Sequence, residues 1–137
     1  MKAKSLIICL LLILSSNIAN SQKTYNLESP QKNINITITA DNDFLKYSVK
    51  HGSTVIINDS PITMELSDGN VLGASPIVRS FKNETINETI KAEFYKKESV
   101  KNNYNELTLN FKGNYSVQFR AYDDGVAYRF CTKFTKP

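Results

Sequence analysis

The sequence predicts an all-β fold, an antiparallel β-sandwich, and three features of the chain lead to this prediction. Apolar and polar residues alternate with a period of two in several runs, which is the pattern of a strand with one buried face. These runs are rich in β-branched and aromatic residues, which strands favour. Turn-forming residues recur about every ten positions, and short strands at that spacing are typical of a sandwich.

The first half of the chain contains several of these strands. Ile34, Ile36 and Ile38 alternate with asparagine and threonine, as expected for a half-buried strand. A shorter run before them ends at Ser29-Pro30. The strands expected here cover residues 34–40, 44–49, 54–57 and 62–67, with turns at 41–43, 51–53 and 68–69.

The middle of the chain gives a weaker signal. Residues 71–78 contain a glycine and a proline and are expected to form a loop. In residues 81–100, Ile86, Ile90 and Phe94 recur every fourth residue, as on one face of a helix. The threonines beside them are β-branched, however, and no second apolar row widens the stripe. We therefore expect a long, polar, mostly extended connection here.

The clearest strand pattern lies in the last third of the chain. Leu107, Leu109 and Phe111 alternate with polar residues, and a turn is expected at Gly113-Asn114. A matching apolar alternation returns over residues 115–121. The two runs together predict an antiparallel hairpin with one apolar face.

Residues 119–130 consist of two aromatic, strand-forming runs joined at Asp123-Asp124-Gly125. Gly125 favours a tight turn, because glycine accepts the positive φ that such turns require. Arg120 and Arg129 lie on the two arms, and an arginine needs water or a carboxylate partner. The arms therefore cannot be buried on every side.

The first 21 residues have the features of a secretory signal peptide. Lys2 and Lys4 form a basic start, an apolar run covers residues 6–14, and Ala19-Asn20-Ser21 supplies small residues before a cleavage site. The apolar run is too short to span a bilayer. We expect cleavage before Gln22 and a secreted or periplasmic protein without a membrane anchor.

Cysteine content and charge limit the anchors, disulfides and partners expected for the mature chain, residues 22–137. Cys9 follows Ile8 without the small residue that lipid attachment favours, so a lipoprotein anchor is the weaker alternative. Cys131 alone remains after cleavage, and no internal disulfide is expected. Loss of the two leader lysines lowers the formal net charge of +4 by two, which gives little support for a nucleic-acid partner.

Four motifs along the chain carry a family resemblance. They are Leu27-Glu28-Ser29-Pro30, Ser60-Pro61-Ile62 followed by Asp68-Gly69, Tyr104-Asn105-Glu106-Leu107, and the run 119–130. Their order and spacing resemble the N-terminal β-sandwich domain of glycoside hydrolase family 97, the secreted bacterial α-glucosidases and α-galactosidases. The resemblance extends over nearly all of residues 22–137.

The resemblance implies a fold and a supporting function. The fold is a two-sheet super-sandwich like that of galactose mutarotase, which the family's catalytic (β/α)₈ barrel follows. Because the sequence ends at Pro137, we expect a partial domain with an incomplete sandwich, truncated before that barrel. The domain would pack on the barrel and shape a pocket for an α-linked oligosaccharide or glycoside, and the chain alone is expected to be inactive. The resemblance implies calcium for the full enzyme, and no calcium ligand is placed on this chain.

No catalytic or metal-binding residue is expected on this chain. Glycosidases use two carboxyl groups across the scissile bond, and one is often held protonated by burial. The candidate carboxylates here have no recognisable acid/base setting: Glu84, Glu88, Glu106, Asp123 and Asp124. His51 stands alone in an expected turn. Asp41-Asn42-Asp43 lacks the glycine and the distant glutamate of a calcium loop.

The tyrosines and one motif leave alternatives open. Four tyrosines can serve either as sandwich core or as stacking faces for sugar rings, and we favour the core: Tyr104, Tyr115, Tyr122 and Tyr128. Tyr104, Asn105 and Glu106 are expected at a domain interface or at the rim of a sugar site. The alternative function is a stand-alone secreted carbohydrate-binding or adhesive module, which requires an exposed row of aromatics. A third, an immunoglobulin-like module, lacks its tryptophan and paired cysteines.

Overall fold

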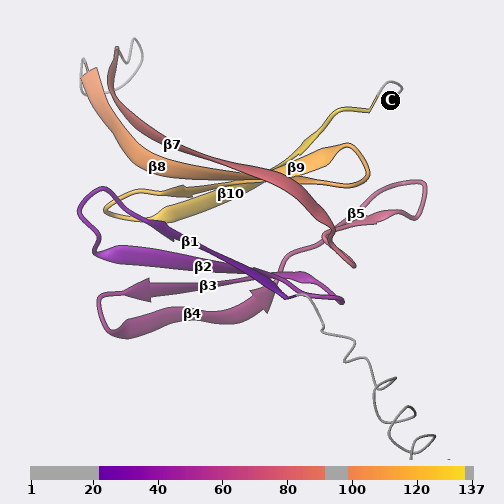
Figure 1. Ribbon diagram of the computed structural model, residues 1–137. Helices are drawn as coiled ribbons and strands as arrows, with labels where there is room; N and C mark the ends of the chain where they lie inside the picture. Colours follow the sequence, from indigo (N-terminus) through magenta and orange to yellow (C-terminus); the bar gives the residue numbers. More distant parts are fainter. Residues whose placement is uncertain (1–21, 92–98, 135–137) are drawn as a thin grey trace, which may run out of the picture.

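The computed structural model describes residues 22–91 and 99–134, and within these residues all regular structure is β-strand. Two four-stranded antiparallel sheets lie face to face, and a short two-stranded hairpin lies at one end (Figure 1). The predicted antiparallel β-sandwich is therefore confirmed. The predicted signal peptide, residues 1–21, lies outside the described residues.

The first sheet is a meander with the order β1-β2-β3-β4. Its strands are β1 (Lys23–Glu28), β2 (Ile34–Ala40), β3 (Leu45–His51) and β4 (Thr54–Pro61). β2 pairs with β3 in a register that places Ile36 opposite Val49 and Ile38 opposite Tyr47. Because successive side chains of a strand point to opposite faces, this register turns the buried isoleucines toward the second sheet.

The second sheet has the order β10-β9-β8-β7. Its strands are β7 (Val78–Lys91), β8 (Ser99–Phe111), β9 (Tyr115–Ala121) and β10 (Val126–Thr132). The predicted turn between β8 and β9 is confirmed, and both Gly113 and Asn114 have a positive φ, of 100° and 58°. The hairpin places Phe111 opposite Tyr115.

The core lies between the two sheets. Its fully buried side chains come from both of them: Ile36, Ile38 and Leu45 from the first, and Leu107, Leu109, Val117 and Phe119 from the second. Aromatic contacts extend this packing to the margins. The ring centroids of Tyr47 on β3 and Tyr128 on β10 are 5.6 Å apart, and those of Tyr25 on β1 and Phe81 on β7 are 5.4 Å apart.

The prediction of a connection over residues 81–100 is wrong, although the extended conformation is confirmed. Described residues of this region form the outer parts of β7 and β8, which pair with each other; residues 92–98, which include Phe94, lie outside the described residues. A spacing of four is also a multiple of two, so Ile86 and Ile90 share one face of a strand. They lie opposite Tyr104 and Val100.

The polar character of this hairpin has a structural reason. Its far ends rise away from the β1–β4 sheet (Figure 1), so that they have no second layer to bury an apolar face. β7 is accordingly exposed along most of its length. A strand without a covering layer does not need the alternation by which strands are recognised in a sequence.

Two smaller expectations also need correction. The strand expected over residues 62–67 is limited to β5 (Met64–Glu65), and it pairs with β6 (Val71–Leu72), inside the expected loop. The turn at 123–125 is present, since Tyr122 N donates to Gly125 O at 2.8 Å. Gly125, however, does not have the positive φ for which glycine was expected there.

Gly73 joins the two sheets, and its replacement by alanine is expected to destabilise the fold. Its carbonyl accepts a hydrogen bond from Leu45 N at 2.8 Å, and its N–H donates to the Tyr115 hydroxyl at 3.2 Å. Its φ is +86°, and an added Cβ would lie 2.2 Å from the Ile62 carbonyl oxygen. Strain at such a φ alone costs about 1–3 kcal/mol.

Comparing the urea unfolding of Gly73→Ala with that of Gly69→Ala separates the effect of the close contact with Ile62 from the effect of the positive φ. Gly69 has a similar φ of +83°, but nothing lies within 4 Å of its added Cβ. We expect Gly73→Ala to lower the free energy of unfolding clearly more than Gly69→Ala. Equal losses would contradict the role assigned to Gly73.

Asp41 holds the turn between β2 and β3, and its charge makes the stability of this turn depend on pH. Its Oδ1 accepts hydrogen bonds from the N–H groups of Asp43 and Phe44, at 2.8 and 2.7 Å. Its Oδ2 pairs with Lys46 Nζ at 2.7 Å. The hydrogen bond from Lys46, followed by those from the backbone, lowers the pKa of Asp41 to about 2.

The sign of this pH effect follows from the lowered pKa. A carboxyl group with a lower pKa in the folded state stabilises the fold above its ordinary pKa of 3.8 and loses this effect as the pH falls through about 2. We expect Asp41→Asn to flatten the loss of stability between about pH 4 and pH 2, as measured by urea unfolding across that range. The effect is small because the pair is open to solvent, and an unchanged pH dependence would contradict it.

Candidate functional site

The outer face of the β7–β10 sheet carries a connected group of polar side chains. Leu107 and Leu109 of β8 face the core, so the alternation turns Tyr104 and Glu106 to the opposite face. Arg120 of β9 lies directly opposite Glu106. Tyr104 and Glu106 are each only 5% exposed, which is unusual for residues on the outer side of a sandwich.

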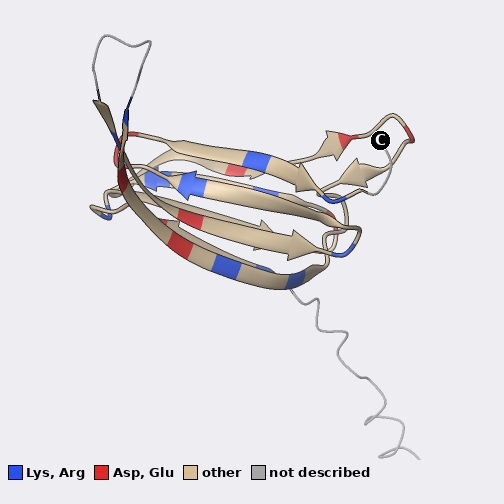
Figure 2. Cartoon of the chain, turned by 90° about the horizontal axis from the view of Figure 1, so that it is seen from above, with Lys and Arg blue, Asp and Glu red and all other residues tan. Residues whose placement is uncertain are grey.

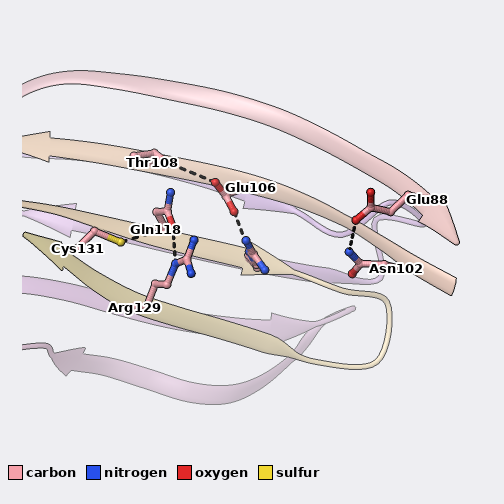
Figure 3. A network of polar contacts seen from close by, with 8 residues as sticks. Glu88, Asn102, Glu106, Thr108, Gln118, Arg129 and Cys131 are labelled. Carbon is pink, nitrogen blue, oxygen red and sulfur yellow. Dashed lines mark hydrogen bonds and ion pairs between the residues drawn. The ribbon is translucent and has the colours of Figure 1, made fainter. Parts of the chain in front are cut away.

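An ion pair is at the centre of this group. Arg120 Nε donates to Glu106 Oε2 at 2.7 Å, and Thr108 Oγ1 donates to Glu106 Oε1 at 3.3 Å (Figure 3). The Arg120 guanidinium also lies over the Tyr104 ring, 4.4 Å from its centroid. The rings of Tyr104 and Tyr122 are in contact, with centroids 4.9 Å apart. Carboxylate, guanidinium and aromatic faces thus satisfy one another on one sheet face.

Two members of this group, Arg120 and Tyr104, have raised pKa values. Burial alone lowers the pKa of Arg120, but hydrogen bonds to Glu106 and Tyr122 outweigh it and raise the pKa above its usual value. Burial raises the pKa of Tyr104, with the nearby Arg120 acting in the opposite direction. Arg120 therefore stays cationic and Tyr104 neutral, which suits a fixed recognition surface rather than proton transfer.

A small pocket lies beside the ion pair, between β9 and β10. Its volume is about 110 Å³, and it is lined by Gln118, Arg120, Tyr122, Ala127, Tyr128 and Arg129. Arg129 Nε donates to Gln118 Oε1, and the Cys131 thiol lies 3.6 Å from the same oxygen (Figure 3). Two guanidinium groups therefore border one small depression.

A larger cavity of about 800 Å³ lies at the end of the sandwich that carries β5 and β6. The Tyr115 ring and the Lys112-Gly113 turn form one wall, and the β5–β6 hairpin forms another. Exposed apolar side chains border it: Val71, Ile77 and Phe134. Its lining is mixed, and it holds no cluster of ionisable groups that would suggest catalysis.

Comparison with known proteins shows what kind of domain carries this surface. The family described as glycosyl-hydrolase 97 N-terminal matches residues 27–136. The chain belongs to this family. A curated relative, the retaining α-galactosidase of Bacteroides thetaiotaomicron, is 38% identical over 136 residues. The match covers 99% of this chain and 20% of the relative, so the chain spans about a fifth of that protein's length.

Solved structures of family 97 enzymes contain a similar sandwich. The enzyme of Pseudoalteromonas sp. strain K8 in complex with acarbose superimposes with a TM-score of 0.69 at 26% identity, over 77% of this chain and 17% of that one. A β-arabinopyranosidase shares the fold with a TM-score of 0.73 at 20% identity, over 82% and 18% of the two chains. The family 97 resemblance expected from the four motifs is confirmed.

The family 97 domain places Tyr104, Asn105 and Glu106 on two different faces. Tyr104 and Glu106 lie on the outer face of the β7–β10 sheet, whereas Asn105 points toward the first sheet. Asn105 Nδ2 donates to Glu28 O at 2.8 Å, and its Oδ1 accepts from Thr85 Oγ1 at 2.8 Å. Asn105 therefore ties β8 to β7 and to the end of β1. The interface or sugar-rim role of the three residues stays a prediction.

Three of the other four candidate carboxylates of the family 97 domain have structural partners, and the fourth, Asp124, is exposed in the β9–β10 turn. Glu84 pairs with Lys82 at 2.8 Å, and Glu88 accepts from Asn102 at 2.8 Å. Asp123 Oδ1 accepts from Gln31 N at 2.7 Å, which fastens the β9–β10 turn to the β1–β2 turn. Basic and acidic positions are interspersed along the strands (Figure 2). These contacts stabilise the sandwich.

The four tyrosines have different surroundings. Tyr115 is buried in the core, as the core interpretation predicts, whereas Tyr104 is buried on the outer face of the β7–β10 sheet and Tyr122 is partly buried there. Burial raises the pKa of Tyr115, and the hydrogen bond with Gly73 acts in the opposite direction. Tyr128 is 46% exposed, but its ring packs against Tyr47. The tyrosines therefore do not form the exposed aromatic row that a stand-alone sugar-binding module requires.

Residues 22–91 and 99–134 contain neither a cluster of metal-binding side chains nor a membrane-spanning helix. Nowhere in these ranges do three His, Cys, Asp or Glu side chains gather in a way that could hold a metal ion. His51 is exposed at the end of β3, and Cys131 is a partly buried free thiol. The same ranges contain no helix with the length and apolarity needed to cross a membrane.

The pairing of Arg120 with Glu106 and the pocket beside Arg129 were not predicted from the sequence. The sequence indicates that both arginines need water or a carboxylate, but it does not identify the carboxylate. The missing signal is the length of the β8–β9 loop, which has three residues, 112–114, rather than the two of the expected Gly113-Asn114 turn. With Phe111 opposite Tyr115, counting back along both strands brings Glu106 opposite Arg120.

Proposed function

We propose that this chain forms part of the non-catalytic N-terminal domain of a secreted family 97 α-glycosidase. The domain packs on the catalytic barrel of that enzyme and shapes the approach of an α-linked glycoside. One observation carries the proposal: the family 97 N-terminal match extends over residues 27–136, and the chain spans about a fifth of its curated relative. A supporting role agrees with the structural partners of Glu84, Glu88 and Glu106.

Secretion is part of this proposal and rests on the leader pattern of residues 1–21. Export through the secretory route would remove the leader and leave Gln22 as the first residue. Mass measurement of the protein recovered from the periplasm or the medium tests this directly. An intact Met1 on the recovered protein would contradict it.

Calcium remains a proposal for the complete enzyme only. The resemblance implies a calcium site in that enzyme, and no group of three His, Cys, Asp or Glu side chains gathers in the described residues. We therefore assign no calcium ligand to this chain. No step of the supporting role depends on the ion.

The expected result of an activity assay is no hydrolysis by the chain itself. The full 137-residue chain is incubated with 4-nitrophenyl α-galactoside and α-glucoside, because the curated relative is a retaining α-galactosidase and the solved relative was studied with acarbose. The release of nitrophenol should not exceed that of a heat-treated control. Turnover that co-purifies with the chain would overturn the non-catalytic assignment.

The alternative, a stand-alone carbohydrate-binding module, has lost most of its support because Tyr104 and Tyr115 are buried. Titration of the full chain with maltose and with melibiose separates the two functions. The domain proposal expects no saturable binding to either sugar. Saturable binding, lost on Tyr128→Ala, would favour the module instead, since Tyr128 is the most exposed of the four tyrosines.

A further inference from the structure

We propose that the small pocket between β9 and β10 is a carboxylate-binding site formed by Arg120 and Arg129. This inference concerns a site on the sandwich itself and goes beyond the supporting role proposed above. It rests on the distribution of arginine in the chain, on the way in which the two guanidinium groups are held, and on the charge and size of the pocket.

Arginine is used sparingly in this chain. Only three of the 17 basic residues are arginines: Arg79, Arg120 and Arg129. Two of the three line the same pocket of about 110 Å³. Lysine serves equally well for a solvated surface charge, whereas the planar guanidinium is suited to binding a carboxylate through two parallel hydrogen bonds. Such a concentration is expected where planar anions are recognised.

Both guanidinium groups are held by neighbouring side chains through Nε. Arg120 donates from Nε to Glu106, and Arg129 donates from Nε to Gln118 Oε1. Arg129 lies opposite Gln118 and Arg120 lies opposite Ala127, so the two arginines are diagonal neighbours on adjacent strands. Diagonal positions are about 7–8 Å apart at Cα, within the reach of long side chains. Holding Nε fixes the direction of the terminal nitrogens and lowers the entropy lost on binding.

The charge of the pocket is not balanced. Glu106 compensates Arg120, but no carboxylate lies within 4 Å of the Arg129 guanidinium anywhere in residues 22–91 and 99–134. The pocket therefore has two cationic guanidinium groups and only one carboxylate beside them, which pairs with Arg120. An anion between them would relieve this excess, and Gln118 and Tyr122 add neutral hydrogen-bonding groups to the lining.

The volume of the pocket limits the size of the ligand. Sites for whole drug-sized ligands occupy about 300–1,000 Å³, so that a pocket of about 110 Å³ holds one functional group and its immediate carbon atoms. The ligand is therefore a carboxylate end. Two sources present that chemistry: an acidic side chain of a segment packed on this face, or the carboxylate of an acidic sugar.

The test is an NMR titration of the full chain that follows the arginine side chains. Three arginines give three Nε–Hε signals, and Arg79 is the internal control because it lies on β7, away from the pocket. Sodium acetate is added while sodium chloride is reduced to keep the ionic strength constant, since screening alone moves charged groups. We expect the Arg120 and Arg129 signals to shift together and to saturate, with Arg79 unmoved.

Two further arms make the result decisive. Arg129→Gln should weaken acetate binding at least tenfold, as read from the Arg120 signal, and Arg129→Lys should weaken it less. The same titration is repeated with sodium glucuronate. If glucuronate binds at least tenfold more tightly than acetate, the ligand is an acidic sugar. If the two bind equally, the carboxylate alone is recognised, as an acidic side chain presents it. Signals that do not respond at 100 mM acetate, or three arginines that shift alike, would overturn the proposal.

Discussion

Replacement of Phe119 by alanine is expected to lower the free energy of unfolding by about 3–5 kcal/mol. Phe119 is 1% exposed and lies opposite Leu107 in the middle of the core. The cost combines the lost transfer of the ring from water with the cavity that it leaves. This loss is a large part of the 5–15 kcal/mol that stabilises a typical domain.

Phe81→Ala is the matched control for this measurement. It removes the same atoms from a ring that is 58% exposed at the edge of the second sheet. The expected loss for Phe81→Ala is smaller, about 1–2 kcal/mol, since less than half of its surface leaves water on folding and its ring contact is with Tyr25 alone among the described rings. Phe119→Leu, which keeps most of the volume, allows the comparison if Phe119→Ala does not fold. Similar losses at positions 119 and 81 would contradict the core assignment.

Replacement of Glu106 by alanine is the second change with a large expected effect. Removal of the carboxylate, whose side chain is only 7% exposed, leaves the Arg120 guanidinium without its charged partner. Removing one member of a buried pair costs about 3–5 kcal/mol. Because the Arg120 side chain is 30% exposed and water can reach it, we expect a loss of about 2–3 kcal/mol here.

The Lys82–Glu84 pair is a control on the same sheet. Both side chains are well exposed, with an N–O distance of 2.8 Å that is close to the 2.7 Å of the buried pair. Double-mutant cycles on the two pairs, measured by urea unfolding, separate distance from burial. We expect a coupling energy of about 0.2–1 kcal/mol for the exposed pair and a clearly larger one for the buried pair. Equal coupling would show that burial of Glu106 has no energetic consequence.

The fold could be predicted because the strands that form the core alternate cleanly. Ile34, Ile36 and Ile38 face another layer, and so do Leu107, Leu109 and Phe111; each run bears the period of two. Glycine and asparagine mark the turn between the last two strands. Where one face of a strand is buried by a second sheet, the sequence must alternate, and this requirement makes the strand recognisable.

The outer parts of β7 and β8 could not be predicted for the converse reason. They extend beyond the first sheet, so no layer selects an apolar face, and Ile86 and Ile90 stand among polar residues. Their pairing depends on partners across the hairpin rather than on burial. A local pattern does not contain that information.

The contact between Glu106 and Arg120 on the outer face could not be predicted, because it depends on the pairing register of β8 and β9. The hairpin between β8 and β9 places three residues, Lys112 to Asn114, between the paired Phe111 and Tyr115. A two-residue loop would have shifted the register by one and placed Ala121 opposite Glu106. The sequence thus shows that Arg120 needs a partner, but its pairing with Glu106 follows only from the exact length of the loop.

The measurement that tests the central claim most directly is the activity of a chimera. In the retaining α-galactosidase of Bacteroides thetaiotaomicron, the 136 matched residues are replaced by those of this chain, and hydrolysis of an α-galactoside is measured beside the parent enzyme. If the chain is a supporting family 97 domain, the chimera should fold and retain turnover within about tenfold of the parent, that is, within about 1.4 kcal/mol in activation free energy. A folded chimera without turnover would contradict the claim that this sandwich performs the supporting role of the family.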